Sequence, residues 1–324
     1  MIIIYFQRLF FNWAGILLDL WRKYFKMHVL LTGSSGFIGS KLLIKLLSEN
    51  ISVELLSRHN HKNLKTTIID FDNLNNFNDL YIDKSIDVVL HLAGYAHDVK
   101  GKNSKYYNLN TLSTISLAKK CLESRVKKFI FVSSIKAANY NNSNQNQINS
   151  RDLYAKGKRE SELGILEVAK NSSMQVVILR PALIYGPNVK GNLELMLSGI
   201  KNGWFPPLPN MNDCHSMVHI DDVVLTLLKL TNQTENIDGK IFCITDGVKY
   251  SARDIYNILR SVCNKPKIRW TMPKFMFNLA SFLHPAIKRK INKLFQNECY
   301  DYSEMDAIEF FPTKQLKDIN ETNI

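Results

Sequence analysis

Three residues in the middle of the chain are of types that can move a proton together. Tyr154 and Lys158 are four positions apart in a stretch, 151–169, whose pattern predicts a helix, so they share one helix face. An ammonium beside a phenol favours the phenolate and lowers its pKa from about 10, which gives a general acid or base usable near neutral pH. Ser134 ends a predicted strand, 127–134, and ligands of open α/β sheets bind at the carboxyl ends of strands. A tyrosine and a lysine at this spacing are common on amphipathic helices, so the weight of the pattern depends on the elements around it.

A glycine-rich turn near the start of the chain predicts a nucleotide site. An apolar strand, 28–31, is followed by Gly33, Gly36 and Gly39 and then by apolar residues at helical spacing. Gly33 permits a tight turn, Gly36 lets the backbone approach a pyrophosphate, and Gly39 lets the helix pack on the strand. The positive end of the helix dipole then faces the anion. A strand before the glycines and a helix after them are the context that a dinucleotide-binding motif requires.

The ends of the next two predicted strands bear on the choice of cofactor. An acidic residue normally follows the second strand of an NAD site and binds the ribose 2′-hydroxyl. Here the strand 51–56 is followed by Ser57 and Arg58, and a cation suits the 2′-phosphate of NADP. The alternative is that Arg58 is a surface residue and that NAD binds through other contacts. Asp70, at the end of a short predicted strand, either accepts a hydrogen bond from the adenine amino group or is a turn residue.

Further strands and helices alternate along the chain, which is typical of an α/β fold with a doubly wound sheet. A buried strand, 86–92, ends at Ala93 and Gly94, small residues that let the backbone approach a cofactor, and a helix is predicted from Asn110. We place a dinucleotide-binding domain at 27–186 and a substrate lobe at 187–324. A strand near 240–245 is expected to return from that lobe to the main sheet.

Residues 1–26 form an extension ahead of the first strand. Its uncharged stretch, 9–18, has ten residues, whereas a bilayer span takes about 20 apolar residues. One interpretation is an interfacial amphipathic helix that makes peripheral contact with the inner face of a membrane. The other is an upstream start, with Met27 as the true first residue.

Charge and cysteine content constrain the partners. The net charge is +13, and no acidic residue lies between Asp254 and Glu298, where nine Lys and Arg occur. A solvated basic face, a phosphate-bearing substrate and an anionic membrane surface are all compatible with this charge; no nucleic-acid motif accompanies it, so no nucleic-acid partner is expected. The five cysteines show no metal-ligand spacing, which predicts no metal site and reduced thiols in a cytoplasmic protein.

Taken in order, these landmarks resemble the extended short-chain dehydrogenase/reductase family, in its nucleotide-sugar epimerase/dehydratase branch. The resemblance covers about residues 27–314 and implies a Rossmann fold: a seven-stranded, mostly parallel sheet with helices on both faces and a smaller C-terminal lobe for a sugar nucleotide. It also implies a homodimer formed through two helices. The residues that carry the resemblance are 32–39, 91–94, Ser133-Ser134, Tyr154 with Lys158, Arg180-Pro181, 185–187, and His219 to Asp222.

The resemblance also implies roles for individual residues. Tyr154 is the expected catalytic base or acid, Lys158 holds the nicotinamide ribose and lowers the pKa of Tyr154, and Ser134 hydrogen-bonds the reacting sugar oxygen. Asn110 is expected to support the backbone of the active site. The expected cofactor-binding residues are Gly33, Ser35, Gly36, Phe37, Ile38, Gly39, Arg58, Asp70, Phe71, Leu92, Ala93, Gly94, Asn110 and Pro181, and the expected substrate-binding residues are Asn188, Lys190 and His215.

Departures from the family pattern narrow the reaction. Sugar-nucleotide dehydratases place an Asp-Glu pair directly after the catalytic Ser or Thr, whereas Ile135 and Lys136 stand there in this chain. This difference disfavours a 4,6-dehydratase.

His215 stands where the family usually has an arginine for the nucleotide diphosphate, which leaves open how that contact is made. For His219, a packed histidine at a helix cap beside Asp221 or Asp222 is favoured over a catalytic role.

The resemblance implies hydride transfer at C4 of a UDP-sugar. The first hypothesis is a reductase of a UDP-4-keto-6-deoxy-N-acetylhexosamine in surface polysaccharide synthesis, with Arg58 favouring NADP over NAD as the cofactor. The alternative is a UDP-glucose or UDP-N-acetylglucosamine 4-epimerase, which uses the same residues. A second alternative is a non-catalytic dinucleotide-binding protein, and the intact set of Ser134, Tyr154 and Lys158 disfavours it.

Overall fold

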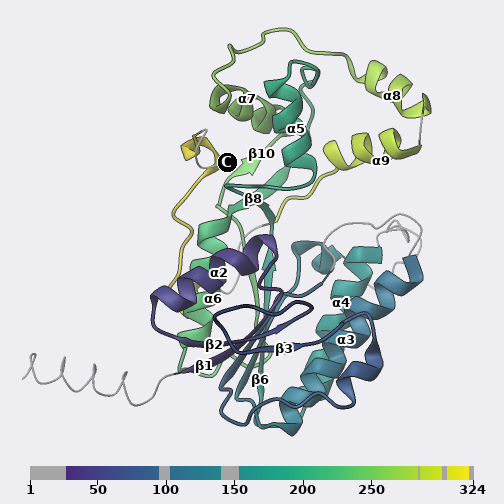
Figure 1. The fold of residues 1–324 in the computed structure, drawn as a ribbon. Coiled ribbons are helices and arrows are strands. Elements are labelled where there is room, and N and C mark those ends of the chain that lie inside the picture. The colour runs from purple at the N-terminus through teal and green to yellow at the C-terminus, as the bar shows by residue number, and fades with distance from the viewer. Residues whose placement is uncertain (1–26, 95–102, 140–152, 284, 301–304, 321–324) are drawn as a thin grey trace, which may run out of the picture.

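The computed structural model describes residues 27–94, 103–139, 153–283, 285–300 and 305–320 (Figure 1). Residues 1–26, for which an interfacial helix is one of the two interpretations, lie outside the described residues, as do residues 140–152 before Tyr154. Within the described ranges, no helix is long and apolar enough to cross a membrane.

Seven strands form one sheet in which every pairing is parallel. The strand order reverses beside β1, which pairs with β2 on one side and β4 on the other. A crevice that binds ligands is expected at the carboxyl ends of strands at such a reversal. In spatial order the strands are β3 (Thr66–Ile68), β2 (Ser52–Ser57), β1 (His28–Thr32), β4 (Val88–His91), β5 (Lys128–Val132), β6 (Gln175–Pro181) and β9 (Ile241–Ile244).

Helices cover both faces of this sheet (Figure 1). On one face lie α2 (Phe37–Ser48) and α6 (Ile220–Asn232), and the other is covered by α3 (Asn103–Glu123) and α4 (Leu153–Ala169). The alternation of side chains along β1 explains why both faces are apolar: Val29 and Leu31 pack in the core under α2, and Leu30 packs in the core under α3. The predicted Rossmann architecture is therefore confirmed.

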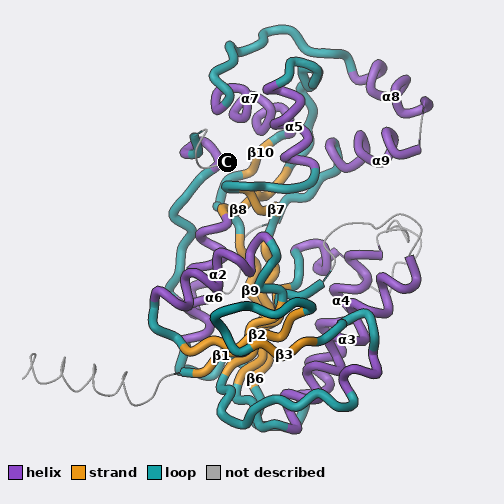
Figure 2. The backbone as a smooth tube through the Cα atoms, viewed as in Figure 1, coloured by secondary structure: helices purple, strands orange, loops and turns teal. Residues whose placement is uncertain are grey.

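A smaller lobe stands at one end of the large sheet (Figure 2). Its three-stranded sheet has the order β10 (Lys249–Tyr250), β8 (His215–His219), β7 (Leu183–Tyr185), with β7 parallel and β10 antiparallel to β8. Four of the described helices belong to this lobe: α5 (Asn192–Lys201), α7 (Ala252–Val262), α8 (Lys274–Leu283) and α9 (Pro285–Leu294). Short 3-10 turns complete the elements: η1 (Leu74–Phe77), η2 (Ile135–Asn139), η3 (Met305–Ile308) and η4 (Leu316–Asp318).

The C-terminal segment, 305–319, runs along both lobes (Figure 1). Met305 is buried in the core under α2, whereas Leu316 is buried in the core of the smaller lobe. Between these anchors the buried carboxylate of Asp222 accepts hydrogen bonds from the backbone N–H groups of Thr313 (3.1 Å) and Lys314 (3.2 Å). One segment thus connects two hydrophobic cores.

Two helix starts show how far local sequence patterns indicate where a helix begins. Ser251 is the N-cap of α7, where its hydroxyl accepts a hydrogen bond from the N–H of Asp254 at 3.0 Å. By contrast, α3 begins at Asn103, seven residues before Asn110, the start that the pattern predicted. The residues between the two positions are mostly polar, so they give no apolar periodicity from which a helix could be recognised.

Candidate functional site

The glycine turn is packed tightly between β1, β4 and α2. Gly33 has a φ of +72°, and a Cβ there would lie 2.7 Å from the backbone N of Ala93. A Cβ at Gly39 would lie 2.1 Å from the carbonyl oxygen of Gly33, so the helix approaches the turn as closely as backbone permits. Gly36 is the N-cap of α2, and neither a capping side chain nor an acidic residue occupies the first turn. The N–H groups in the first turn of α2 and the positive end of the helix dipole therefore suit an anion such as the pyrophosphate of a dinucleotide.

A buried hydrogen-bond chain fixes the ends of the two strands behind this turn. The hydroxyl oxygen of Thr32 accepts hydrogen bonds from the N–H groups of Leu92 (3.1 Å) and Ala93 (3.0 Å). The same oxygen lies 2.8 Å from Nδ1 of His91, and Nε2 of His91 lies 3.0 Å from the hydroxyl of Thr114. Burial lowers the pKa of His91 to about 3, so this ring is neutral. It serves as a bridge between β1, β4 and α3.

Three segments that are far apart in sequence meet at Gly94. A Cβ at Gly94 would lie 3.4 Å from Oδ1 of Asn110 and 3.9 Å from Nζ of Lys158. The Lys158 ammonium donates a hydrogen bond to the carbonyl of Val132 at 2.8 Å and lies 4.6 Å from the ring centroid of Phe131. Burial of the ammonium lowers the pKa of Lys158 to about 8. The structure therefore places a cation at the end of β4, with backbone close beside it.

Ser134 and Tyr154 both precede Lys158 along the chain. Ser134 lies between β5 and η2, and its hydroxyl accepts a hydrogen bond from the N–H of Lys136 at 3.3 Å. Tyr154 is half-buried in the first turn of α4, one turn before Lys158, and α4 packs against η2. The predicted catalytic residues thus come from the end of one strand and two turns of one helix, and their roles stay predictions.

A buried ion cluster behind Lys158 was not predicted from the sequence. Glu162, one turn beyond Lys158 and inaccessible to solvent, accepts two hydrogen bonds from Arg180, at 2.8 and 2.6 Å. It also accepts a hydrogen bond from the hydroxyl of Ser133 at 2.5 Å and one from Arg159 at 3.1 Å. The cluster ties α4 to the ends of β5 and β6 and so fixes the helix that carries Lys158. An acid at this spacing and an arginine at a strand end were its only sequence signals.

Other predicted cofactor residues border the same strand ends. Arg58 is exposed just after β2. The carboxylate of Asp70 accepts the N–H of Asp72 at 3.0 Å, as a turn residue does, and the ring of Phe71 stacks 6.0 Å from that of His91. The rest lie in the glycine turn, in the first turn of α2 and at the end of β6: Ser35, Phe37, Ile38 and Pro181.

The predicted substrate residues lie in the smaller lobe. Asn188 and Lys190 are exposed in the turn between β7 and α5. His215 is buried at the start of β8, and its Nε2 lies 3.1 Å from a carboxylate oxygen of Asp213. That oxygen also accepts the N–H of Ala252 at 2.6 Å. His215 is thus held by a neighbouring carboxylate, and its contact with a nucleotide stays a prediction.

His219 is the N-cap of α6. Its Nδ1 accepts a hydrogen bond from the N–H of Asp221 at 3.1 Å, which confirms the prediction of a histidine packed at a helix cap. Asp221 in turn forms salt bridges with Lys41 of α2 (3.0 Å) and with Lys314 of the C-terminal segment (2.5 Å). The cap therefore links three parts of the chain.

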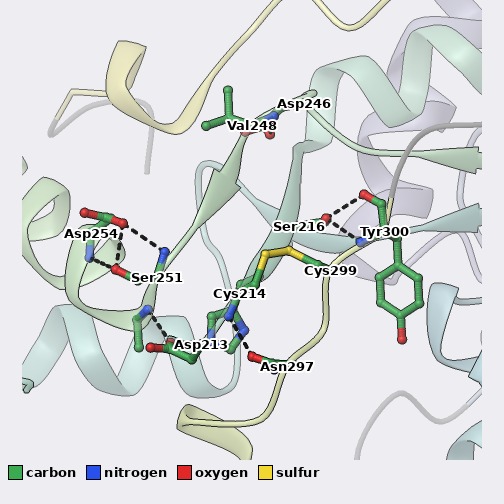
Figure 3. The surroundings of a disulfide bond; sticks show 12 residues. Asp213, Cys214, Ser216, Asp246, Val248, Ser251, Asp254, Asn297, Cys299 and Tyr300 are labelled. Atoms are coloured by element: carbon green, nitrogen blue, oxygen red, sulfur yellow. Dashed lines mark hydrogen bonds and ion pairs between the residues drawn. A yellow bond between two sulfur atoms is a disulfide. The ribbon is translucent and has the colours of Figure 1, made fainter. Parts of the chain in front are cut away.

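Cys214 and Cys299 form a disulfide beside β8 (Figure 3). The prediction that all five cysteines are reduced thiols is therefore wrong for this pair. The cause is tertiary: the segment around Glu298 lies beside β8, where Ser216 donates its N–H to the carbonyl of Glu298 at 3.0 Å and its hydroxyl to the carbonyl of Tyr300 at 2.7 Å. This brings the two cysteine Cα atoms within 5.3 Å across 85 residues of sequence.

The segment beside β8 also reaches the neighbourhood of Ser134. Lys136, two residues beyond Ser134, forms a salt bridge with Glu298 at 2.7 Å. Sugar-nucleotide dehydratases carry an acid pair at positions 135 and 136, so this chain has a structural cation in place of an acid. That the chain lacks 4,6-dehydratase activity stays a prediction.

The fold is that of a dinucleotide-binding Rossmann protein, and the predicted tyrosine–lysine pair lies on α4. The sequence profile of the NAD dependent epimerase/dehydratase family matches residues 29–245. The chain belongs to this family of enzymes.

Named relatives agree with this assignment. The UDP-glucose 4-epimerase of Vibrio cholerae is 30% identical in an alignment of 272 positions that covers 78% of this chain and 80% of the relative. Among solved structures, the UDP-glucose 4-epimerase of Thermotoga maritima with UDP-glucose superimposes with a TM-score of 0.70 at 18% identity, covering 91% of this chain and 97% of that one. MoeE5 in complex with UDP-glucose and NAD gives a TM-score of 0.67 at 19% identity, with 90% and 95% covered.

Proposed function

We propose that this protein is a UDP-sugar 4-epimerase that keeps NAD bound through its reaction. One observation carries the proposal: three groups meet after β4. A Cβ at Gly94 would lie 3.4 Å from Oδ1 of Asn110 and 3.9 Å from Nζ of Lys158. The segments that bear Ser134 and Tyr154 lie beside them. The 4-epimerase from Vibrio cholerae, similar over most of its length, supports the choice of reaction.

Each residue of the chain has a separate task in this proposal. Tyr154 takes the proton from the 4-hydroxyl of the sugar and later returns it, while Ser134 donates a hydrogen bond to the same oxygen. The Lys158 ammonium, held by the carbonyl of Val132, binds the nicotinamide ribose and stabilises the phenolate of Tyr154. When bound, NAD accepts the hydride from C4 and gives it back to the opposite face of the sugar.

The smaller lobe binds the UDP-sugar in this proposal. Asn188 and Lys190 are exposed on the turn before α5 and contact the nucleotide. His215 takes the place of the arginine expected at the diphosphate. The chain works as a homodimer formed through two helices. The mass of the purified protein in solution measures the number of subunits.

The test is an assay of the full chain without added cofactor. UDP-glucose and UDP-N-acetylglucosamine are each incubated with the protein, and the 4-epimers are quantified. Tyr154→Phe is expected to lower kcat by about 10²- to 10⁴-fold, because a general acid–base group is removed. Tyr81→Phe, at a tyrosine that is 70% exposed, is the matched control and keeps full activity. Unchanged turnover of every tested sugar in Tyr154→Phe would refute the catalytic role.

A reductase of a UDP-4-keto-6-deoxy-N-acetylhexosamine is the second candidate, and Arg58 favours it. This cation is exposed directly after β2, where it suits the 2′-phosphate of NADP. Stoichiometric loss of NADPH with a 4-keto sugar, and no interconversion of 4-epimers without added cofactor, would select the reductase. Identification of the dinucleotide released from the denatured protein separates NAD from NADP.

A further inference from the structure

One face of α8 exposes large apolar side chains. Phe275, Leu279 and Phe282 are 66%, 64% and 82% exposed. Their spacing of four and three residues places them on one side of the helix. Trp270, in the loop that leads into α8, is 62% exposed. Isolated exposed apolar residues are ordinary, whereas a row of three on one helix face indicates an interaction surface.

The opposite side of α8 determines which way this row points. Phe277 is buried in the core of the smaller lobe, where its ring packs edge-on against that of Phe295 at 5.4 Å. α8 also packs against α9, and both lie at the outer edge of the smaller lobe (Figure 1). Because Phe277 anchors the inner side, the row of Phe275, Leu279 and Phe282 is held outward.

The stretch of chain that contains this row is strongly basic. The chain from 255 to 297 contains nine Lys and Arg and no Asp or Glu. Lys274 at the start of α8 is exposed, and so are Lys288 and Lys290 on α9. No acidic side chain in this stretch neutralises them. Exposed aromatic and aliphatic groups next to unneutralised cations are the composition of interfacial helices that bind anionic membranes.

We propose that the outer surface of α8 and α9, the α8–α9 face, binds an anionic lipid bilayer. The apolar row enters the boundary between headgroups and acyl chains, and the lysines contact lipid phosphates. Trp270 has the amphipathic ring that favours this boundary. Nucleic acid would leave the apolar row in water, and an uncharged apolar partner would leave the lysines unused, so a lipid surface satisfies both observations.

The experiment is co-sedimentation of the full chain with vesicles. Vesicles of phosphatidylcholine mixed with phosphatidylglycerol are compared with vesicles of phosphatidylcholine alone. The native chain is expected to bind the anionic vesicles and to be released by salt. Phe275→Ser, Leu279→Ser and Phe282→Ser combined should lower the partition coefficient at least about tenfold, because the inserted apolar area is lost. Lys288→Gln with Lys290→Gln should lower it about fivefold for each charge, on anionic vesicles only.

Matched controls separate this surface from the rest of the chain. Ile44→Ser removes an equally exposed apolar residue on α2, and Lys84→Gln removes an exposed lysine far along the sequence; both should bind as the native chain does. Undiminished vesicle binding by the triple variant would overturn the proposal and assign binding to another segment, such as 1–26. Preferred binding of RNA or DNA in competition with vesicles would overturn it, as would a dimer that the triple variant dissociates in the absence of lipid.

Discussion

Lys158 shows how one side chain is prepared for its task by its surroundings. Its ammonium is held by the carbonyl of Val132 and lies against the ring of Phe131, and burial lowers its pKa to about 8. The nearby carboxylate of Glu162 opposes that shift but is itself occupied by Arg180. The charge on Lys158 is therefore present at neutral pH and lost under mildly alkaline conditions.

The first prediction concerns the pH dependence of turnover. Below pH about 8 the Lys158 ammonium is charged and supports the phenolate of Tyr154, so kcat/KM should fall as the pH rises through about 8. In Lys158→Arg the cation persists at high pH, because a guanidinium does not deprotonate in proteins, and the alkaline fall near pH 8 should disappear. Profiles of kcat/KM against pH for both proteins are the measurement. The same alkaline limb in both would show that another group titrates.

The same shift has a defined effect on stability. Because the pKa is lowered from 10.5 to about 8 in the folded chain, the unfolded chain binds more protons between these values. The contribution of Lys158 to the free energy of unfolding therefore increases as the pH rises through this window. Activity and this stability contribution thus move in opposite directions, which distinguishes loss of the ammonium from loss of the fold.

The close contact of α2 with the glycine turn requires a residue without a side chain at position 39. α2 begins directly after Gly36, and its approach to β1 depends on the missing side chain at Gly39. A Cβ there would meet the carbonyl oxygen of Gly33, which is backbone and cannot rotate away. The position of the whole helix, and with it the anion site at its N-terminus, depends on this one glycine.

Gly39→Ala should therefore move α2 and impair cofactor binding. The expected loss in the free energy of unfolding is about 1–3 kcal/mol, as for other overpacked sites. Thermal unfolding and the amount of dinucleotide released on denaturation are the two measurements. Ser40→Ala, at an exposed position of the same helix, should change neither quantity. Full cofactor content with an unchanged melting temperature in Gly39→Ala would contradict the role assigned to this contact.

Connections between distant segments hold the whole molecule together. The disulfide of Cys214 with Cys299 (Figure 3) closes a loop that, by sequence, includes β8, α6, β9, β10 and the helices α7 to α9. Asp222, on α6, holds the returning C-terminal segment through Thr313. The disulfide therefore joins two segments beside β8 of the smaller lobe, and Asp222 ties the C-terminal segment to α6. Since disulfides are uncommon in reducing compartments, the cysteines no longer support the predicted cytoplasmic location.

Removing the disulfide should lower the stability of the protein. Cys214→Ser with Cys299→Ser is expected to reduce the free energy of unfolding by about 2–4 kcal/mol, chiefly because the unfolded chain gains freedom. Denaturant unfolding with and without a reductant measures it: reductant should destabilise the native chain and leave the double variant unchanged. Cys243→Ser, outside the disulfide, should keep the sensitivity to reductant. A native chain indifferent to reductant would rule out a stabilising bond.

The sequence by itself determined the features that depend on neighbours along the chain. The glycine turn, the helical spacing of Tyr154 and Lys158 and the alternation of strands and helices could all be predicted, because a few adjacent residues control each one. The same local signals were sufficient to recognise the family.

Only the tertiary structure decided what lies beside what. It brought Gly94, Asn110 and Lys158 together, buried Glu162 with Arg180, and paired two cysteines that were predicted to be reduced thiols. Such contacts depend on the order and register of strands and on the paths of segments many residues apart. The spacing of residues along the chain does not predict these contacts, because they form only when the hydrophobic cores assemble.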